Sequence, residues 1–93
     1  MGMKYEWDEP KRQSNFATRG LDFGNASGFD WETALTLEDD RQDYGETRYI
    51  AYGLLENRLT VLVYTFREMT VRIISWRKAN VREKKHYDEQ IQN

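Results

Sequence analysis

Apolar and polar positions along the chain follow two periods, and each period predicts a different kind of element. A two-residue alternation, typical of half-buried strands, covers the segments 4–7, 33–37, 47–55, 58–67 and 71–77. The segment 58–67 carries the strongest strand pattern. The links at 56–57 and 68–70 are short, which favours hairpins between consecutive strands. We therefore expect an antiparallel meander in the second half of the chain.

Helical spacing and capping residues predict three helices outside this meander. Asp8 is suited to cap a helix that tolerates Pro10 in its first turn and runs to about Arg19, with Gly20 as its C′ residue. Asp22 caps a second, shorter helix, which two internal glycines weaken. A third helix follows near the C-terminus, where residues 80 and 83 resemble a capping box.

The resulting element order is β-α-α-β-β-β-β-α, which predicts an α+β fold. We expect an antiparallel sheet covered by helices on one face, with a site on the other, partly exposed face. The length of 93 residues suits one domain, at residues 3–93. Residues 1–2, ahead of Met3, are interpreted as an expression remnant or an alternative start.

Composition narrows the classes of function. The chain is 39% hydrophobic and 14% aromatic, as in a globular domain, and contains no cysteine. No apolar run approaches the roughly 20 residues of a membrane helix, and the start is too polar for a signal peptide. We therefore expect a cytoplasmic protein without a membrane partner. Residues 1–46 carry a net charge of −6 and residues 47–93 one of +4. This asymmetry hints at an anion-binding face, although solvating surface charge explains it as well.

Several kinds of catalytic site are disfavoured. His86 is the only histidine, which argues against a histidine-based triad and against a metal site of imidazoles and thiolates. The glycine spacing fits neither a P-loop nor a dinucleotide fingerprint. Carboxylates at positions 38, 39, 40 and 43 suit a hard cation, but an acidic, solvated turn is the favoured interpretation. No metal and no cofactor is expected.

Arginines on strands are the positive chemical signal. They are Arg48, Arg58, Arg67, Arg72 and Arg77. In the last strand, alternation groups Arg77 with Val71, Ile73 and Ser75, and Arg72 with Ile74 and Trp76. Arg48, Arg67 and Arg77 each end a face that is otherwise largely apolar. An arginine there is costly unless it is paired. Two alternatives stay open: a structural bridge to Glu6, Asp8 or Glu46, or projection toward an anion.

Metal-free RNA cleavage would give these arginines a role. Guanidinium groups donate two parallel hydrogen bonds to phosphate oxygens and remain charged, so they stabilise a phosphorane. A carboxylate or a lysine would transfer the proton. Strand aromatics, Tyr64 among them, would stack on bases, although such residues more often belong to the core.

The order of several short motifs resembles the BrnT family of toxins. They are Trp7-Asp8-Glu9-Pro10-Lys11 with Asn15, Gly20-Leu21-Asp22-Phe23, Glu38-Asp39-Asp40-Arg41, Tyr44-Gly45-Glu46, Arg48, Arg72-Ile73-Ile74-Ser75, Arg77, Ala79, Arg82-Glu83 and Tyr87. The resemblance spans nearly the whole chain from Met3. It implies a RelE-like fold, endoribonuclease activity that arrests growth, and a BrnA-like antitoxin with a ribbon-helix-helix domain. Promoter DNA would be bound only through that antitoxin.

Within this hypothesis the candidate site residues take separate roles. Arg48, Arg67 and Arg77 would bind or stabilise the scissile phosphate, and Glu46 or Lys78 would transfer a proton. RNA-binding candidates are Arg19, Arg72 and Tyr64. The family commonly has histidine where this chain has Arg19, and arginine cannot replace a histidine in proton transfer.

Two other functions remain open. The first is a weakly catalytic binding module that acts as co-repressor with its antitoxin. The second is a gyrase-poisoning toxin of the ParE kind. A separate hypothesis concerns the C-terminal helix, whose apolar face, Val81, Tyr87 and Ile91, is thin. We expect it to dock marginally, so that an antitoxin segment would compete for its surface or pack beside it.

Overall fold

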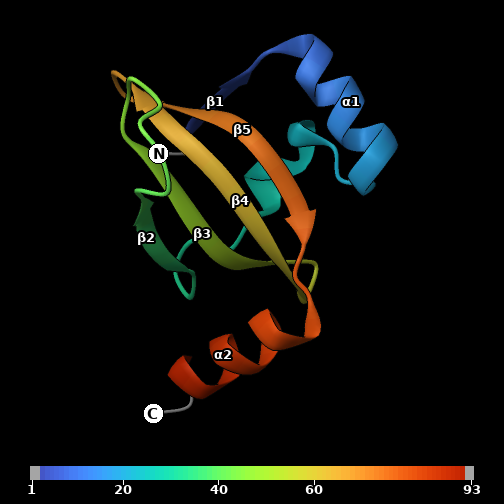
Figure 1. The fold of residues 1–93 in the computed structure, drawn as a ribbon. Helices are drawn as coiled ribbons and strands as arrows, with labels where there is room; N and C mark the ends of the chain where they lie inside the picture. The colour runs from blue at the N-terminus through green and yellow to red at the C-terminus, as the bar shows by residue number, and fades with distance from the viewer. Residues whose placement is uncertain (1–2, 92–93) are drawn as a thin grey trace.

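The computed structural model describes residues 3–91 and confirms the α+β class (Figure 1). In chain order its elements are β1 (Lys4–Trp7), α1 (Glu9–Arg19), the 3₁₀ helix η1 (Phe23–Gly28), β2 (Leu35–Asp39), β3 (Arg48–Leu55), β4 (Arg58–Arg67), β5 (Thr70–Lys78) and α2 (Val81–Ile91). The proposed expression remnant at residues 1–2 lies outside the described residues. The second predicted α-helix is the 3₁₀ helix η1, capped by Asp22, whose side chain accepts a hydrogen bond from the amide of Gly24 at 2.9 Å.

The strands form one five-stranded sheet in the order β1-β5-β4-β3-β2. Strands β2 to β5 form the predicted antiparallel meander, but β1 pairs with β5 in parallel. The prediction of an entirely antiparallel sheet was therefore wrong at this edge. The physical reason is connectivity: β1 leads into a helix and not into a hairpin, so nothing requires an antiparallel neighbour. Glu56 and Asn57 connect β3 and β4 with positive φ at both positions, as a type I′ turn requires.

A β-bulge changes which residues of β5 share a face. Val63 lies opposite Ser75, whereas the next residue, Tyr64, lies opposite Ile73, so Ile74 is the extra residue. Ile73 therefore faces the same side as Trp76, and both are buried in one cluster. The predicted grouping of Ile73 with Ser75 and Arg77 was wrong, because strict alternation does not survive a bulge.

Both faces of the sheet carry a hydrophobic core. One cluster joins the face that contains Ala51, Leu62 and Trp76 to the η1 region. The second joins Val61 and its neighbours to Tyr87 of α2, on the opposite face. The expectation that helices cover a single face was thus wrong, because α2 packs on the other face. It covers only one end of that face, and Figure 1 shows α2 beyond the ends of the strands.

Asn15 joins α1 to the edge of β5. Its side chain donates to the carbonyl oxygens of Trp76 and Leu21, at 2.8 and 3.0 Å, and accepts from the amide of Trp76 at 3.2 Å. Because β1 pairs only with residues 70–73 of β5, Asn15 substitutes for a neighbouring strand further along this edge. It thereby holds the C-terminal end of α1, and Arg19 with it, beside the sheet.

Candidate active-site cleft

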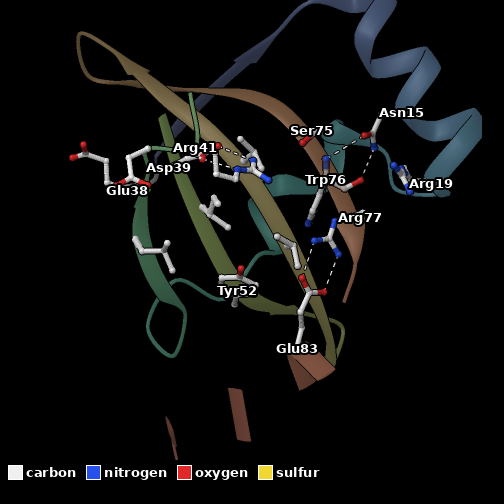
Figure 2. A pocket seen from close by; sticks show the side chains of 15 residues that line it. Asn15, Arg19, Glu38, Asp39, Arg41, Tyr52, Ser75, Trp76, Arg77 and Glu83 are labelled. Atoms are coloured by element: carbon white, nitrogen blue, oxygen red, sulfur yellow. Dashed lines mark hydrogen bonds and ion pairs between the residues drawn. The ribbon is translucent and has the colours of Figure 1, made fainter. Parts of the chain in front are cut away.

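The uncovered part of the α2 face forms a cleft of about 460 Å³. Its floor consists of side chains from β3, β4 and β5, with Tyr52, Val61 and Arg77 side by side in register across the three strands. The loop after β2, the start of α2 and the end of α1 border the cleft (Figure 2). The cleft thus lies on the face of the sheet that α2 leaves partly exposed.

Arg77 projects from β5 into this cleft and is held by a carboxylate. Its two terminal nitrogens donate to Glu83 at 2.9 and 2.8 Å, and its side chain is 38% exposed. Glu83 raises the pKa of Arg77, and Arg77 lowers the pKa of Glu83, so both groups are charged at neutral pH. Arg77 is therefore a fixed cation with part of its surface open to the cleft.

A second arginine, Arg41, enters the cleft from the loop after β2. Asp39 accepts from its Nε at 2.7 Å and from its Nη2 at 2.8 Å, and also from the hydroxyl of Tyr44 at 3.0 Å. The Asp39 side chain is 1% exposed, whereas that of Arg41 is 69% exposed. The guanidinium holds the pKa of Asp39 well below its usual range. The buried carboxylate of Asp39 thus fixes the orientation of the exposed guanidinium of Arg41.

The positive groups of Arg41 and Arg77 are close enough to influence each other. The charge of Arg41 opposes protonation of Arg77, although Glu83 outweighs it and the pKa of Arg77 rises. Arg19, at the end of α1, lines the same cleft and is exposed. In Figure 2, Arg41 and Arg77 lie over the sheet, and Arg19 lies at the end of α1, beyond β5. Converging guanidinium groups favour an anion between them, and phosphate suits their geometry.

The other predicted arginines lie outside this cleft. Arg48 pairs with Glu46 at 3.3 Å and stacks over the ring of Tyr44, at 4.1 Å from its centroid. Arg72 pairs with Glu6 at 2.8 Å across β1 and β5. For Arg48 the structure therefore shows the structural-bridge alternative, with Glu46 as the partner. Arg72, for which no bridge was predicted, is also paired.

Three further candidates are also separate from Arg77. Arg67 is exposed at the end of β4, beside the β4–β5 turn. Lys78 lies opposite Thr60, on the face that carries Trp76, and so points away from the cleft. Tyr64 is 3% exposed, and its burial raises its pKa. Since a buried ring cannot stack on a base, Tyr64 is a core residue, and its assignment to RNA binding was wrong.

Sequence reasoning missed two of the charged groups that define the cleft. Arg41 was included in an acidic turn that was interpreted as solvated surface, and Glu83 was recognised only as a helix cap. The usable signal was the spacing of Asp39 and Arg41, a carboxylate and a guanidinium two residues apart at a strand end. Within residues 3–91 no cluster of His, Cys, Asp or Glu side chains is arranged to hold a metal ion. No helix in that range has both the length and the apolar character needed to cross a membrane.

Comparison with known families places the chain among the toxins of type II toxin–antitoxin systems. A family model described as the ribonuclease toxin BrnT of a type II toxin–antitoxin system matches residues 7–83. The chain belongs to this BrnT family, as its motifs predicted. A type II system pairs its toxin with an antitoxin, so this chain has an antitoxin partner.

Structural comparison agrees with this assignment. The crystal structure of the Brucella abortus ribonuclease toxin BrnT is similar, with a TM-score of 0.67 and 29% sequence identity. The match covers 84% of this chain and 97% of that chain. No curated protein matches the chain.

Proposed function

We propose that this chain is a metal-independent endoribonuclease whose active site is the cleft between Arg41 and Arg77. The observation that supports the proposal is the convergence of these two cations, with Arg19 beside them, on an open sheet face. The family is named for a ribonuclease toxin. A phosphodiester of single-stranded RNA bound there would receive hydrogen bonds from both guanidinium groups. These donors are strongest when negative charge accumulates on the phosphorane, so they favour the transition state.

In the proposed reaction the ribose 2′-hydroxyl loses its proton and its oxygen attacks the adjacent phosphorus. The O2′–P bond forms, the P–O5′ bond breaks, and the departing 5′-oxygen takes up a proton from water. Glu46 lies outside the cleft lining, and Lys78 points to the opposite face, so neither is well placed for the first proton. Glu83 lines the cleft, but Arg77 lowers its pKa and bonds to both of its oxygens. We therefore assign it the role of proton acceptor only after the phosphate has displaced it from Arg77.

Arg19 lies at the border of the cleft and extends the positive surface along the path of a bound strand. Because it stays protonated, its role is to bind phosphate and not to transfer a proton. Arg48, Arg67 and Arg72 lie outside the cleft lining, and in this scheme they contribute to the RNA-binding surface. Growth arrest by RNA cleavage in the cytoplasm, and neutralisation by a ribbon-helix-helix antitoxin of the BrnA kind, belong to the same proposal.

The test is induction of the chain alone in bacteria, beside Arg77→Ala, Arg41→Ala and Lys78→Ala variants. We expect discrete RNA cleavage and growth arrest with the parent chain and with Lys78→Ala, and neither effect with the other two variants. A folded Arg77→Ala variant that still arrests growth would overturn the proposal. Intact RNA with normal growth would instead support the co-repressor function, and intact RNA with DNA damage would support gyrase poisoning.

A further inference from the structure

The guanidinium of Arg77 already binds an anion that belongs to the chain itself. Its two terminal nitrogens contact the two carboxylate oxygens of Glu83, at 2.9 and 2.8 Å. This is the two-pronged arrangement in which a guanidinium also binds two oxygens of a phosphate. A phosphate that approaches Arg77 in this way meets a position that the carboxylate occupies, and the two anions repel each other.

Glu83 connects this contact to the start of α2. Its carboxylate also accepts a hydrogen bond from the amide of Asn80 at 2.9 Å, and its own amide donates to the Asn80 side chain at 2.8 Å. These two bonds form the capping box that begins the helix. Movement of the Glu83 carboxylate away from Arg77 therefore strains or opens the first turn of α2.

The rest of α2 is held weakly enough to respond. Among its described residues only Tyr87 is buried, and its hydroxyl donates to the carbonyl oxygen of Thr33 at 2.9 Å. Val81 is 81% exposed at the start of the helix, and Ile91 is 47% exposed at its end. The first turn of α2 thus depends on the contact between Glu83 and Arg77 for much of its attachment to the sheet.

We propose that Glu83 is an internal competitor for the phosphate site, so that RNA binding displaces it from Arg77 and loosens the first turn of α2. This inference rests on the proposed function of the cleft. If Glu83 competes in this way, the position of α2 regulates the affinity of the cleft for RNA. A partner protein that clamps α2 against the sheet keeps Arg77 occupied by Glu83, and so weakens RNA binding without entering the cleft.

The first test measures binding of a fluorescent single-stranded oligodeoxynucleotide, which lacks the 2′-hydroxyl and is not cleaved. Glu83→Gln removes the negative charge but retains an oxygen for the Asn80 amide. Glu68→Gln, in the turn between β4 and β5, is the matched control with the same change in net charge. We expect Glu83→Gln to bind about fivefold more tightly than Glu68→Gln, the effect of removing a partly exposed ion pair. Equal or weaker binding by Glu83→Gln would overturn the inference.

A double-mutant cycle shows whether the effect passes through Arg77. In an Arg77→Ala background, Glu83→Gln should raise the affinity for the oligodeoxynucleotide much less, because no guanidinium remains for the substitution to free. An equally large increase in affinity in that background would refute the competition between Glu83 and phosphate for Arg77.

Hydrogen exchange tests the coupling to α2 in the unaltered chain. We expect the bound oligodeoxynucleotide to accelerate exchange at the amides of residues 83 and 84, both of which donate to Asn80. Unchanged or slower exchange there would count against the inference. Failure of the proposed function looks different: an Arg77→Ala variant would still cleave RNA. If cleavage depends on Arg77 but Glu83→Gln binds no better, only the competition is refuted.

Discussion

Asn15→Ala should destabilise the whole domain, although the residue lies on a helix in which no residue is buried. The substitution removes three hydrogen bonds, two to the main chain of Trp76 and one to the carbonyl of Leu21. Each is worth about 1 kcal/mol. Because the site is only part-buried, water will replace some of them, and we expect a loss of about 2–3 kcal/mol in the free energy of unfolding. For a domain of this size that corresponds to a decrease in Tm of roughly 10–20 °C.

Urea titration followed by tryptophan fluorescence measures this loss, with Ser14→Ala as the control on an exposed position of the same helix. Asn15→Asp should be at least as destabilised as Asn15→Ala. The substitution replaces the amide nitrogen, which donates to the carbonyl oxygens of Leu21 and Trp76 in the parent chain, with a carboxylate oxygen that those two oxygens repel. A loss below about 0.5 kcal/mol for Asn15→Ala would show that the edge of β5 does not depend on this side chain.

Three further predictions concern the site and the core. Asp39→Asn should lower the initial rate of RNA cleavage at least tenfold in the folded chain, because Arg41 loses the carboxylate that orients it. If Asp39 acts through Arg41, the double mutant Asp39→Asn/Arg41→Ala should cleave as fast as Arg41→Ala alone. The same pair should make stability depend on pH. Arg41 lowers the pKa of Asp39 in the folded chain below its ordinary value of 3.8. The ion pair therefore stabilises the folded state fully above pH 3.8, and this stabilisation is lost as the pH falls through the lower, folded-state pKa. Thermal melts between pH 5 and pH 2 should therefore show a smaller acid-induced decrease for Asp39→Asn than for the parent chain. Gly53→Ala should cost about 1–3 kcal/mol in urea titrations, because the new methyl carbon would lie 2.3 Å from the ring of Phe29; a stability equal to that of the parent would contradict this packing.

Local patterns predicted most of the fold because local chemistry determines it. The segment 58–67 matches β4, and the two-residue turn before it has the positive φ angles of a tight hairpin. The pairing of β1 was not predictable in this way, because it joins residues 4–7 to residues 70–73, which are far apart in the chain. The bulge at Ile74 was also not foreseen, since no glycine marks it. One extra residue there decided which side chains of β5 share a face with Arg77.

The site was only partly predictable for a related reason. Arg77 was predicted as a candidate because strict alternation placed it at the end of an apolar face of β5, but the bulge in that strand moves Ile73 to the other face. Arg41 lies in a polar loop, where a charge needs no explanation, and only the structure shows that the buried carboxylate of Asp39 binds its guanidinium. Lys78 follows Arg77 in the chain, yet alternation points it to the opposite face. Sequence proximity therefore grouped residues that the sheet separates.

Cleavage of RNA by the purified chain in the presence of EDTA tests the central claim most directly. The parent chain and Lys78→Ala should cleave at similar rates, whereas Arg77→Ala and Arg41→Ala should each lose about 100-fold, the cost of removing one donor to a developing negative charge. Circular dichroism would verify that both variants are folded. Cleavage that requires an added metal ion, or full activity in a folded Arg77→Ala variant, would contradict the proposal that this arginine cleft performs the reaction.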